Sequence, residues 1–97
     1  MPTPSAVEPP TRENVHLYRA AVLAWREAEI EERSRHADIK LSNPHAAEHA
    51  AARAVHALAP EMTYAQAFLL ADKATNWAAQ AHHKWFWRGI PDNGYGL

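Results

Sequence analysis

The residues that could do chemistry most directly lie in the segment HAAEHAAARAVH, residues 45–56. His45, His49 and His56 fall on one face if this segment is a helix, because spacings of four and seven residues follow the helical period. Glu48 lies at the edge of that face. Two histidines one helical turn apart can bind zinc, and a nearby glutamate can activate a zinc-bound water. This face is therefore the candidate metal site.

In five letters, His45-Ala-Ala-Glu48-His49 resembles the H-x-x-E-H signature of inverted zinc proteases. The resemblance implies two histidine ligands and a catalytic glutamate. Those proteases are much larger and carry a further glutamate ligand downstream, whereas Glu61 and Asp72 here have no pattern around them. We favour the simpler interpretation that this is the solvent face of a helix, with no catalytic residue and no cofactor. The alternative is a protein that binds zinc through this face, or a metal-dependent hydrolase that uses it.

The second candidate is the aromatic and basic segment HHKWFWR at residues 82–88. Tryptophan and arginine are enriched in the hot spots of protein interfaces. A competing interpretation packs Trp85 and Phe86 into the core and leaves Trp87 exposed. Nucleic-acid binding through Lys84, Arg88 and the tryptophans is a third hypothesis. The net charge of −1 with neutral histidines argues against it.

These side chains must be positioned by helices, and the clearest helix runs from Thr63 to Gly89. Thr63 and Gln66 predict a capping box at its start. Gly89 predicts a left-handed residue at its end, in a Schellman motif that brings Ile90 against Trp85. Alanines recur along one side at intervals of four and three residues, at positions 67, 71, 74, 78 and 81.

Two further helices are expected before this one. The first runs from about Arg12 to about Arg35, with Thr11 as its N-cap. Within it, Glu29–Arg33 and Glu31–Arg35 have the spacing and order of helix-stabilising ion pairs. Its expected core face consists of Tyr18, Ala21, Val22, Trp25 and Ala28.

The second helix is expected from Asn43-Pro44 to about Leu58, because asparagine is a good N-cap and proline suits the first helical position. Its apolar face consists of Ala47, Ala51, Ala54 and Leu58. This face has the same period as the alanine seam of the third helix. The sequence therefore predicts an all-α, three-helix antiparallel bundle with an alanine-rich seam between the second and third helices.

Composition is consistent with one small domain. The 97 residues contain no cysteine, so no disulfide framework or thiolate metal site is expected. We expect a flexible N-terminal arm over residues 1–10, one helical domain over 11–90 and a short tail over 91–97. Residues 1–10 do not resemble a signal peptide, and no apolar run is long enough to span a bilayer. A cytoplasmic location is expected.

The predicted interface consists of apolar side chains on the polar sides of their helices, together with the aromatic end of the third helix. Its residues are Leu23, Ile30, Leu69, Trp85, Trp87 and Arg88. Such exposed apolar residues indicate a binding face if they gather in one patch. We therefore expect a small non-enzymatic interaction or regulatory protein that binds a protein partner or itself. As a background expectation, accessory proteins of mobile elements are often of this size and type.

Overall fold

The computed structural model describes residues 8–36 and 43–91, and this part of the chain is helical with no strand. The helices are α1 (Val15–Arg35), α2 (Ala46–Leu58), α3 (Tyr64–Ala81) and α4 (His83–Trp87). The outer parts of the expected arm and tail, residues 1–7 and 92–97, lie outside the described residues. The expected domain boundaries stay predictions.

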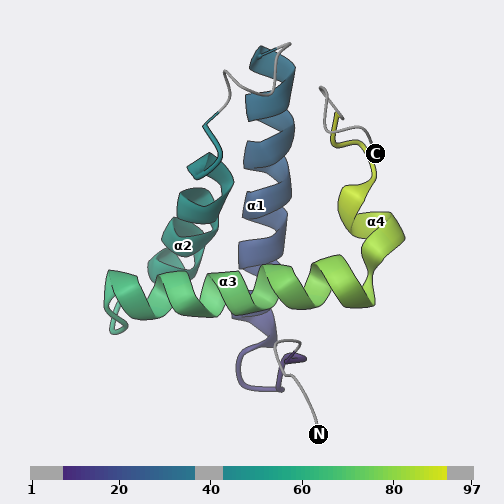
Figure 1. The fold of residues 1–97 in the computed structure, drawn as a ribbon. Coiled ribbons are helices and arrows are strands. Elements are labelled where there is room, and N and C mark those ends of the chain that lie inside the picture. The colour runs from purple at the N-terminus through teal and green to yellow at the C-terminus, as the bar shows by residue number, and fades with distance from the viewer. Residues whose placement is uncertain (1–7, 37–42, 92–97) are drawn as a thin grey trace, which may run out of the picture.

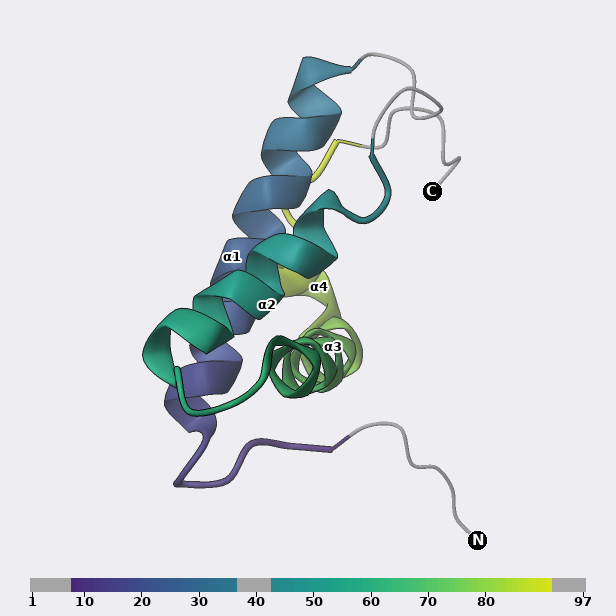
Figure 2. The same ribbon diagram turned by 90° about the vertical axis from the view of Figure 1, so that its left-hand side faces the viewer.

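Three main helices pack on one another as a helical bundle (Figure 1). α1 and α2 lie side by side and run in opposite directions, and α3 crosses both of them. Figure 2 shows α3 almost end-on, on one side of the α1–α2 pair. α4 then turns back along α1. The crossing of α3 is a feature that the spacing of its alanines does not predict.

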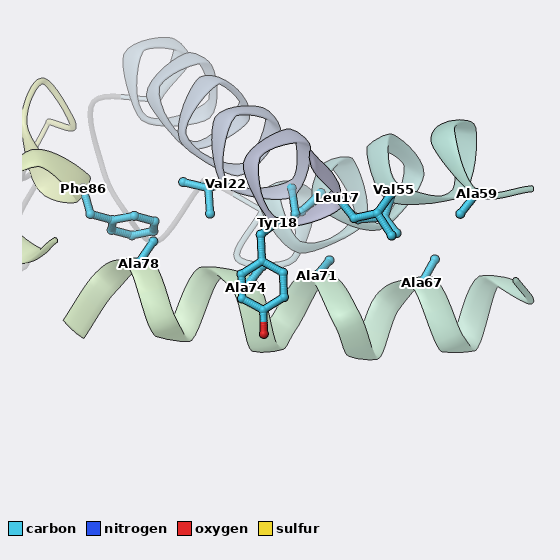
Figure 3. Packing of buried hydrophobic residues seen from close by; sticks show 12 residues of the cluster. Leu17, Tyr18, Val22, Val55, Ala59, Ala67, Ala71, Ala74, Ala78 and Phe86 are labelled. Carbon is cyan, nitrogen blue, oxygen red and sulfur yellow. The ribbon is translucent and has the colours of Figure 1, made fainter. Parts of the chain in front are cut away.

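Most of the predicted alanine seam is present where α3 meets α2 and α1 (Figure 3), whereas Ala54 is half-buried and Ala81 is exposed. Small side chains let helix backbones approach closely. In α3 the buried alanines are Ala67, Ala71, Ala74 and Ala78. In α2 the buried residues are Ala47, Ala51, Ala52 and Val55.

Leu58, which was expected at the end of the α2 seam, is 54% exposed. Val55 and Ala59 take the last positions that face α3, as Figure 3 shows, and Ala59 is buried above Ala67. The expectation for Leu58 is therefore wrong. The prediction assumed that the four-three spacing of the alanines continues to the end of α2. In the structure, the last residue that faces α3 is Ala59, which lies directly after the helix.

The helix starts differ in how well local sequence predicts them. At α3 the capping box is confirmed: the Gln66 N–H donates to the Thr63 hydroxyl at 3.1 Å and the Thr63 N–H donates to the Gln66 side chain at 2.8 Å. At α1 the same kind of exchange joins Thr11 and Asn14, at 2.7 and 3.3 Å. It forms a turn, so the regular helix begins three residues later than expected, at Val15.

The stretch from Thr63 to Gly89 is not one helix, which corrects the prediction. His82 leaves the helical conformation, with φ −127° and ψ 48°, and separates α3 from α4. The break changes which residues of the aromatic end face the core. Phe86 becomes buried against Trp25, with ring centroids 4.9 Å apart. Packing with α1 therefore favours the break over a straight helix.

The end of α4 is a tight turn rather than the expected Schellman motif. Gly89 has the predicted positive φ, at 83°. Arg88 has φ −65° and ψ 128°, and the Ile90 N–H donates to the Trp87 carbonyl at 3.3 Å. These values match a type II turn, which needs glycine at its third position. The chain leaves α4 through this turn toward α1.

Candidate functional site

An apolar groove lies between the N-terminal half of α1 and the junction of α3 with α4. Its volume is about 320 Å³. Val15, Leu23 and Trp85 on its walls are 49%, 47% and 39% exposed. Most of the lining is apolar and comes from three helices, namely Val15, Val22, Leu23, Trp77, Ala78 and Trp85. We call this the α1/α4 groove.

Arg26 on α1 sets the position of Trp85. Its guanidinium carbon lies 4.6 Å from the centre of the Trp85 ring, a cation–π contact. Its Nε donates to the Phe86 carbonyl at 3.0 Å, and its Nη2 donates to the Arg88 carbonyl. Arg26 therefore binds carbonyls that the end of α4 leaves without helical partners. One side chain orders both the exposed ring and the helix end.

Among the described residues, the permanently charged side chain that lines the α1/α4 groove is that of Arg19. Arg19 and His82 line it, and none of the described lining residues is a carboxylate. Tyr18 also lines it, and its hydroxyl donates to the Glu8 carbonyl at 2.8 Å. Burial, and secondarily the negative charge of Glu8, raise the pKa of Tyr18. The groove thus combines apolar walls with the cationic side chain of Arg19, while the Glu8 carboxylate outside the lining acts on Tyr18.

The described part of the N-terminal arm, residues 8–10, lies beside this groove. The Glu8 carboxylate pairs with the Lys73 ammonium of α3 at 3.4 Å. Pro10 forms part of the groove wall. The arm therefore contacts α1 and α3 of its own chain at these residues.

The residues of the predicted interface do not form one patch. Leu23 and Trp85 share the groove, whereas Ile30 lines a separate hollow beside Arg53 of α2. Leu69 is 68% exposed on α3 and lines neither of these hollows. Leu23, Ile30, Leu69 and Trp87 therefore do not line one common hollow.

Trp85 and Trp87 exchange the environments that the packing interpretation gave them. Trp87 is half-buried and meets the Trp25 ring edge-on, with centroids 6.0 Å apart. Trp85 is exposed in the groove wall. The break at His82 causes this exchange, because it shifts the helical phase of the residues that follow. Arg88 is exposed, as expected.

Two polar side-chain contacts lie on the histidine face of α2. Nδ1 of His45 lies 3.0 Å from a Glu48 carboxylate oxygen, and Nδ1 of His49 lies 2.7 Å from the Tyr64 hydroxyl. His56 lies edge-on to the Tyr64 ring, at 6.4 Å. Within the described ranges, no three histidine, aspartate or glutamate side chains gather closely enough to hold a metal ion. Zinc binding here stays a prediction that metal analysis can test.

Sequence reasoning missed the basic residues that organise the groove. Arg19, Arg26 and Arg33 are spaced seven residues apart and so lie along one side of α1. Arg26 binds the end of α4, and Nη1 of Arg33 donates to the Pro91 carbonyl at 2.7 Å. This spacing was the available signal. Of these three arginines, the i,i+4 pattern assigns a partner only to Arg33, namely Glu29, because it concerns neighbours on one helix and not distant carbonyls.

Comparisons of the chain with protein-family models, curated proteins and solved structures give no match. Each helix within residues 8–36 and 43–91 is too short or too polar to span a lipid bilayer. Functional inference therefore depends on the geometry of the α1/α4 groove and its surroundings.

Proposed function

We propose that this protein is a small non-enzymatic interaction protein that binds another protein through the α1/α4 groove. The observation that carries the proposal is that Val15, Leu23 and Trp85 remain exposed around one hollow of about 320 Å³. Apolar side chains that gather on one surface mark interaction sites, whereas scattered ones are normal. A protein of this kind acts as a regulator or an adaptor by occupying its partner.

The contacts that hold the exposed Trp85 ring in place support this proposal. Tryptophan is a frequent hot-spot residue, and a side chain ordered before binding loses little conformational freedom on binding. Arg26 stacks on the Trp85 ring and holds the surrounding backbone. The exposed ring is therefore a preformed anchor for a partner.

The proposed occupant is an amphipathic segment of another protein whose apolar side chains are flanked by carboxylates. Arg19 and His82 line the groove, and the described lining holds no acidic residue. Complementary charge favours encounter with an acidic partner and disfavours a basic one. The apolar side chains would fill the groove, and the carboxylates would reach Arg19.

The test replaces Leu23 with a photoreactive amino acid in the native host and identifies the crosslinked protein and peptide by mass spectrometry. Leu69 is a matched control, since it is also an exposed leucine but lies outside the groove. We expect one dominant partner from position 23, joined through an apolar segment with nearby carboxylates. Position 69 should not capture it.

A Trp85→Ala change in the Leu23 photoreactive chain should weaken capture by about 30-fold, because hot-spot tryptophans contribute about 2 kcal/mol or more. Circular dichroism would confirm that this variant remains helical. Three outcomes would contradict the proposal: equal capture from positions 23 and 69, a basic crosslinked segment, or crosslinks only to a second copy of this chain.

A further inference from the structure

A second hollow lies on a different side of the molecule, where α1, α2, α3 and α4 meet. Its volume is about 210 Å³, and it shares no lining residue with the α1/α4 groove. Four aromatic rings and two carboxylates define its chemistry, from Trp25, Glu48, Phe68, Asp72, Phe86 and Trp87. We call it the aromatic–acidic cavity.

The aromatic part of this cavity is held at fixed angles. Trp25 and Trp87 are perpendicular, with centroids 6.0 Å apart, and Phe86 lies 5.2 Å from Trp87 at 82°. Phe86 is 1% exposed, so it anchors the two half-buried indoles from behind. Trp25 and Trp87 both line the hollow, and indole rings are the best aromatic partners for a cation, as in the aromatic cages that bind quaternary ammonium groups.

The charged residues of the cavity have one sign. Glu48 comes from α2 and Asp72 from α3, and no lysine, arginine or histidine is among the described lining residues. One Glu48 oxygen lies 3.0 Å from Nδ1 of His45, and the Asn76 side-chain amide donates to an Asp72 carboxylate oxygen at 3.5 Å. The carboxylates and the negative faces of the indole rings therefore attract the same kind of ligand, a cation.

We propose that the aromatic–acidic cavity binds a small alkylammonium cation. The Trp25 and Trp87 rings contact its alkyl groups, and the Glu48 and Asp72 carboxylates supply opposite charge. A metal ion fits this site poorly, because most of its wall is carbon and no cluster of three metal-ligating side chains occurs in the described ranges. This site is independent of the protein-binding role proposed for the groove.

The test is a titration of the folded chain with choline at pH 8, where histidines of ordinary pKa are neutral. Two-dimensional NMR reports the four indole N–H groups separately. We expect saturable shifts at Trp25 and Trp87. Trp77 and Trp85 line the groove instead and serve as internal controls. The neutral isostere 3,3-dimethylbutan-1-ol should bind at least about threefold more weakly, the lower end of a cation–π contribution.

The double variant Glu48→Gln/Asp72→Asn keeps the size of both side chains and removes both charges. It should raise the Kd for choline by about tenfold, while the exposed control Glu61→Gln should change it by less than about twofold. Equal binding of the neutral isostere would overturn the proposal. So would unchanged affinity of the double variant.

A free metabolite and a methylated lysine side chain both present this chemistry. A second titration therefore uses a short peptide that carries trimethyllysine, with the unmodified lysine peptide as its control. Tighter binding of the trimethyllysine peptide than of choline assigns the site to a protein side chain. The reverse order assigns it to a free amine, and failure of both probes overturns the proposal.

Discussion

At the residue scale, two arginines of α1 connect distant parts of the chain. Arg26 binds the carbonyls of Phe86 and Arg88, and Arg33 binds the Glu29 carboxylate and the Pro91 carbonyl at 2.7 Å each. Arg33 is 4% exposed, so its contact with Glu29 belongs to the interior rather than to a solvated helix face. Buried charges of this kind require partners, and the Pro91 carbonyl is one of those of Arg33.

Tyr18 predicts a loss of stability in alkaline solution. Burial, then Glu8, raise the pKa of Tyr18 above its ordinary value of 10.0. The folded state therefore holds this proton more tightly than the unfolded state, and the stability it contributes is complete below about pH 10 and lost as pH rises through the folded pKa. Urea unfolding between pH 8 and 11 should show a steeper decline in the free energy of unfolding for the parent than for Tyr18→Phe. The variant keeps the Lys73–Glu8 ion pair, so it also controls for any effect of pH on that pair. Parallel curves would contradict this assignment.

At the element scale, the break at His82 lets one continuous helical pattern satisfy two neighbours. α3 presents its alanines to α1 and α2, and α4 presents Phe86 to Trp25. Helical backbone hydrogen bonds are retained on both sides of the break. The His82 N–H donates to the Ala78 carbonyl at 2.9 Å, and the Phe86 N–H donates to the His82 carbonyl at 2.8 Å. The break therefore costs few backbone hydrogen bonds, and it changes which aromatic side chain of α4 faces α1.

The seam between elements predicts a size limit at Ala74. This residue is fully buried where α3 crosses its neighbours, so Ala74→Leu should destabilise the fold by about 1–3 kcal/mol, the usual range for overpacking. Ala65→Leu lies on the exposed side of the same helix and should change stability by less than about 0.5 kcal/mol. Urea unfolding followed by circular dichroism measures both. Equal effects of the two changes would mean that the seam does not limit packing.

At the scale of the whole molecule, the crossing of α3 explains why both hollows exist. α3 lies across the α1–α2 pair rather than along it, and its C-terminal end extends past α1 (Figures 1 and 2). The chain continues past the crossing and returns as α4. The α1/α4 groove and the aromatic–acidic cavity lie on different sides of this return.

The same architecture predicts that α4 unfolds locally at a lower free energy than the alanine seam of α3. α4 is five residues long and held mainly by Phe86 and Arg26, whereas Ala74 is buried at the centre of α3. Native-state hydrogen exchange should give the Phe86 amide an opening free energy at least about 1 kcal/mol below that of Ala74, because short peripheral elements open locally. Equal opening energies that both match global unfolding would show that α4 belongs to the main cooperative unit.

Local sequence by itself determined the helical class, the alanine faces and several helix ends. The capping box of Thr63, the positive φ of Gly89 and the ion pairs of α1 depend on residues within four positions of one another. Interactions over so short a span form whenever the local helix or turn forms. For this reason they could be inferred without knowing the fold.

Only the tertiary structure decided which aromatic residue is exposed and where the hollows lie. Trp85 and Trp87 are two residues apart, and the choice between them depends on the break at His82 and on packing against Trp25. Likewise, Arg26 reaches carbonyls about 60 residues further along the chain. Such contacts depend on the angle between helices, which many side chains set jointly, so no short sequence pattern encodes them.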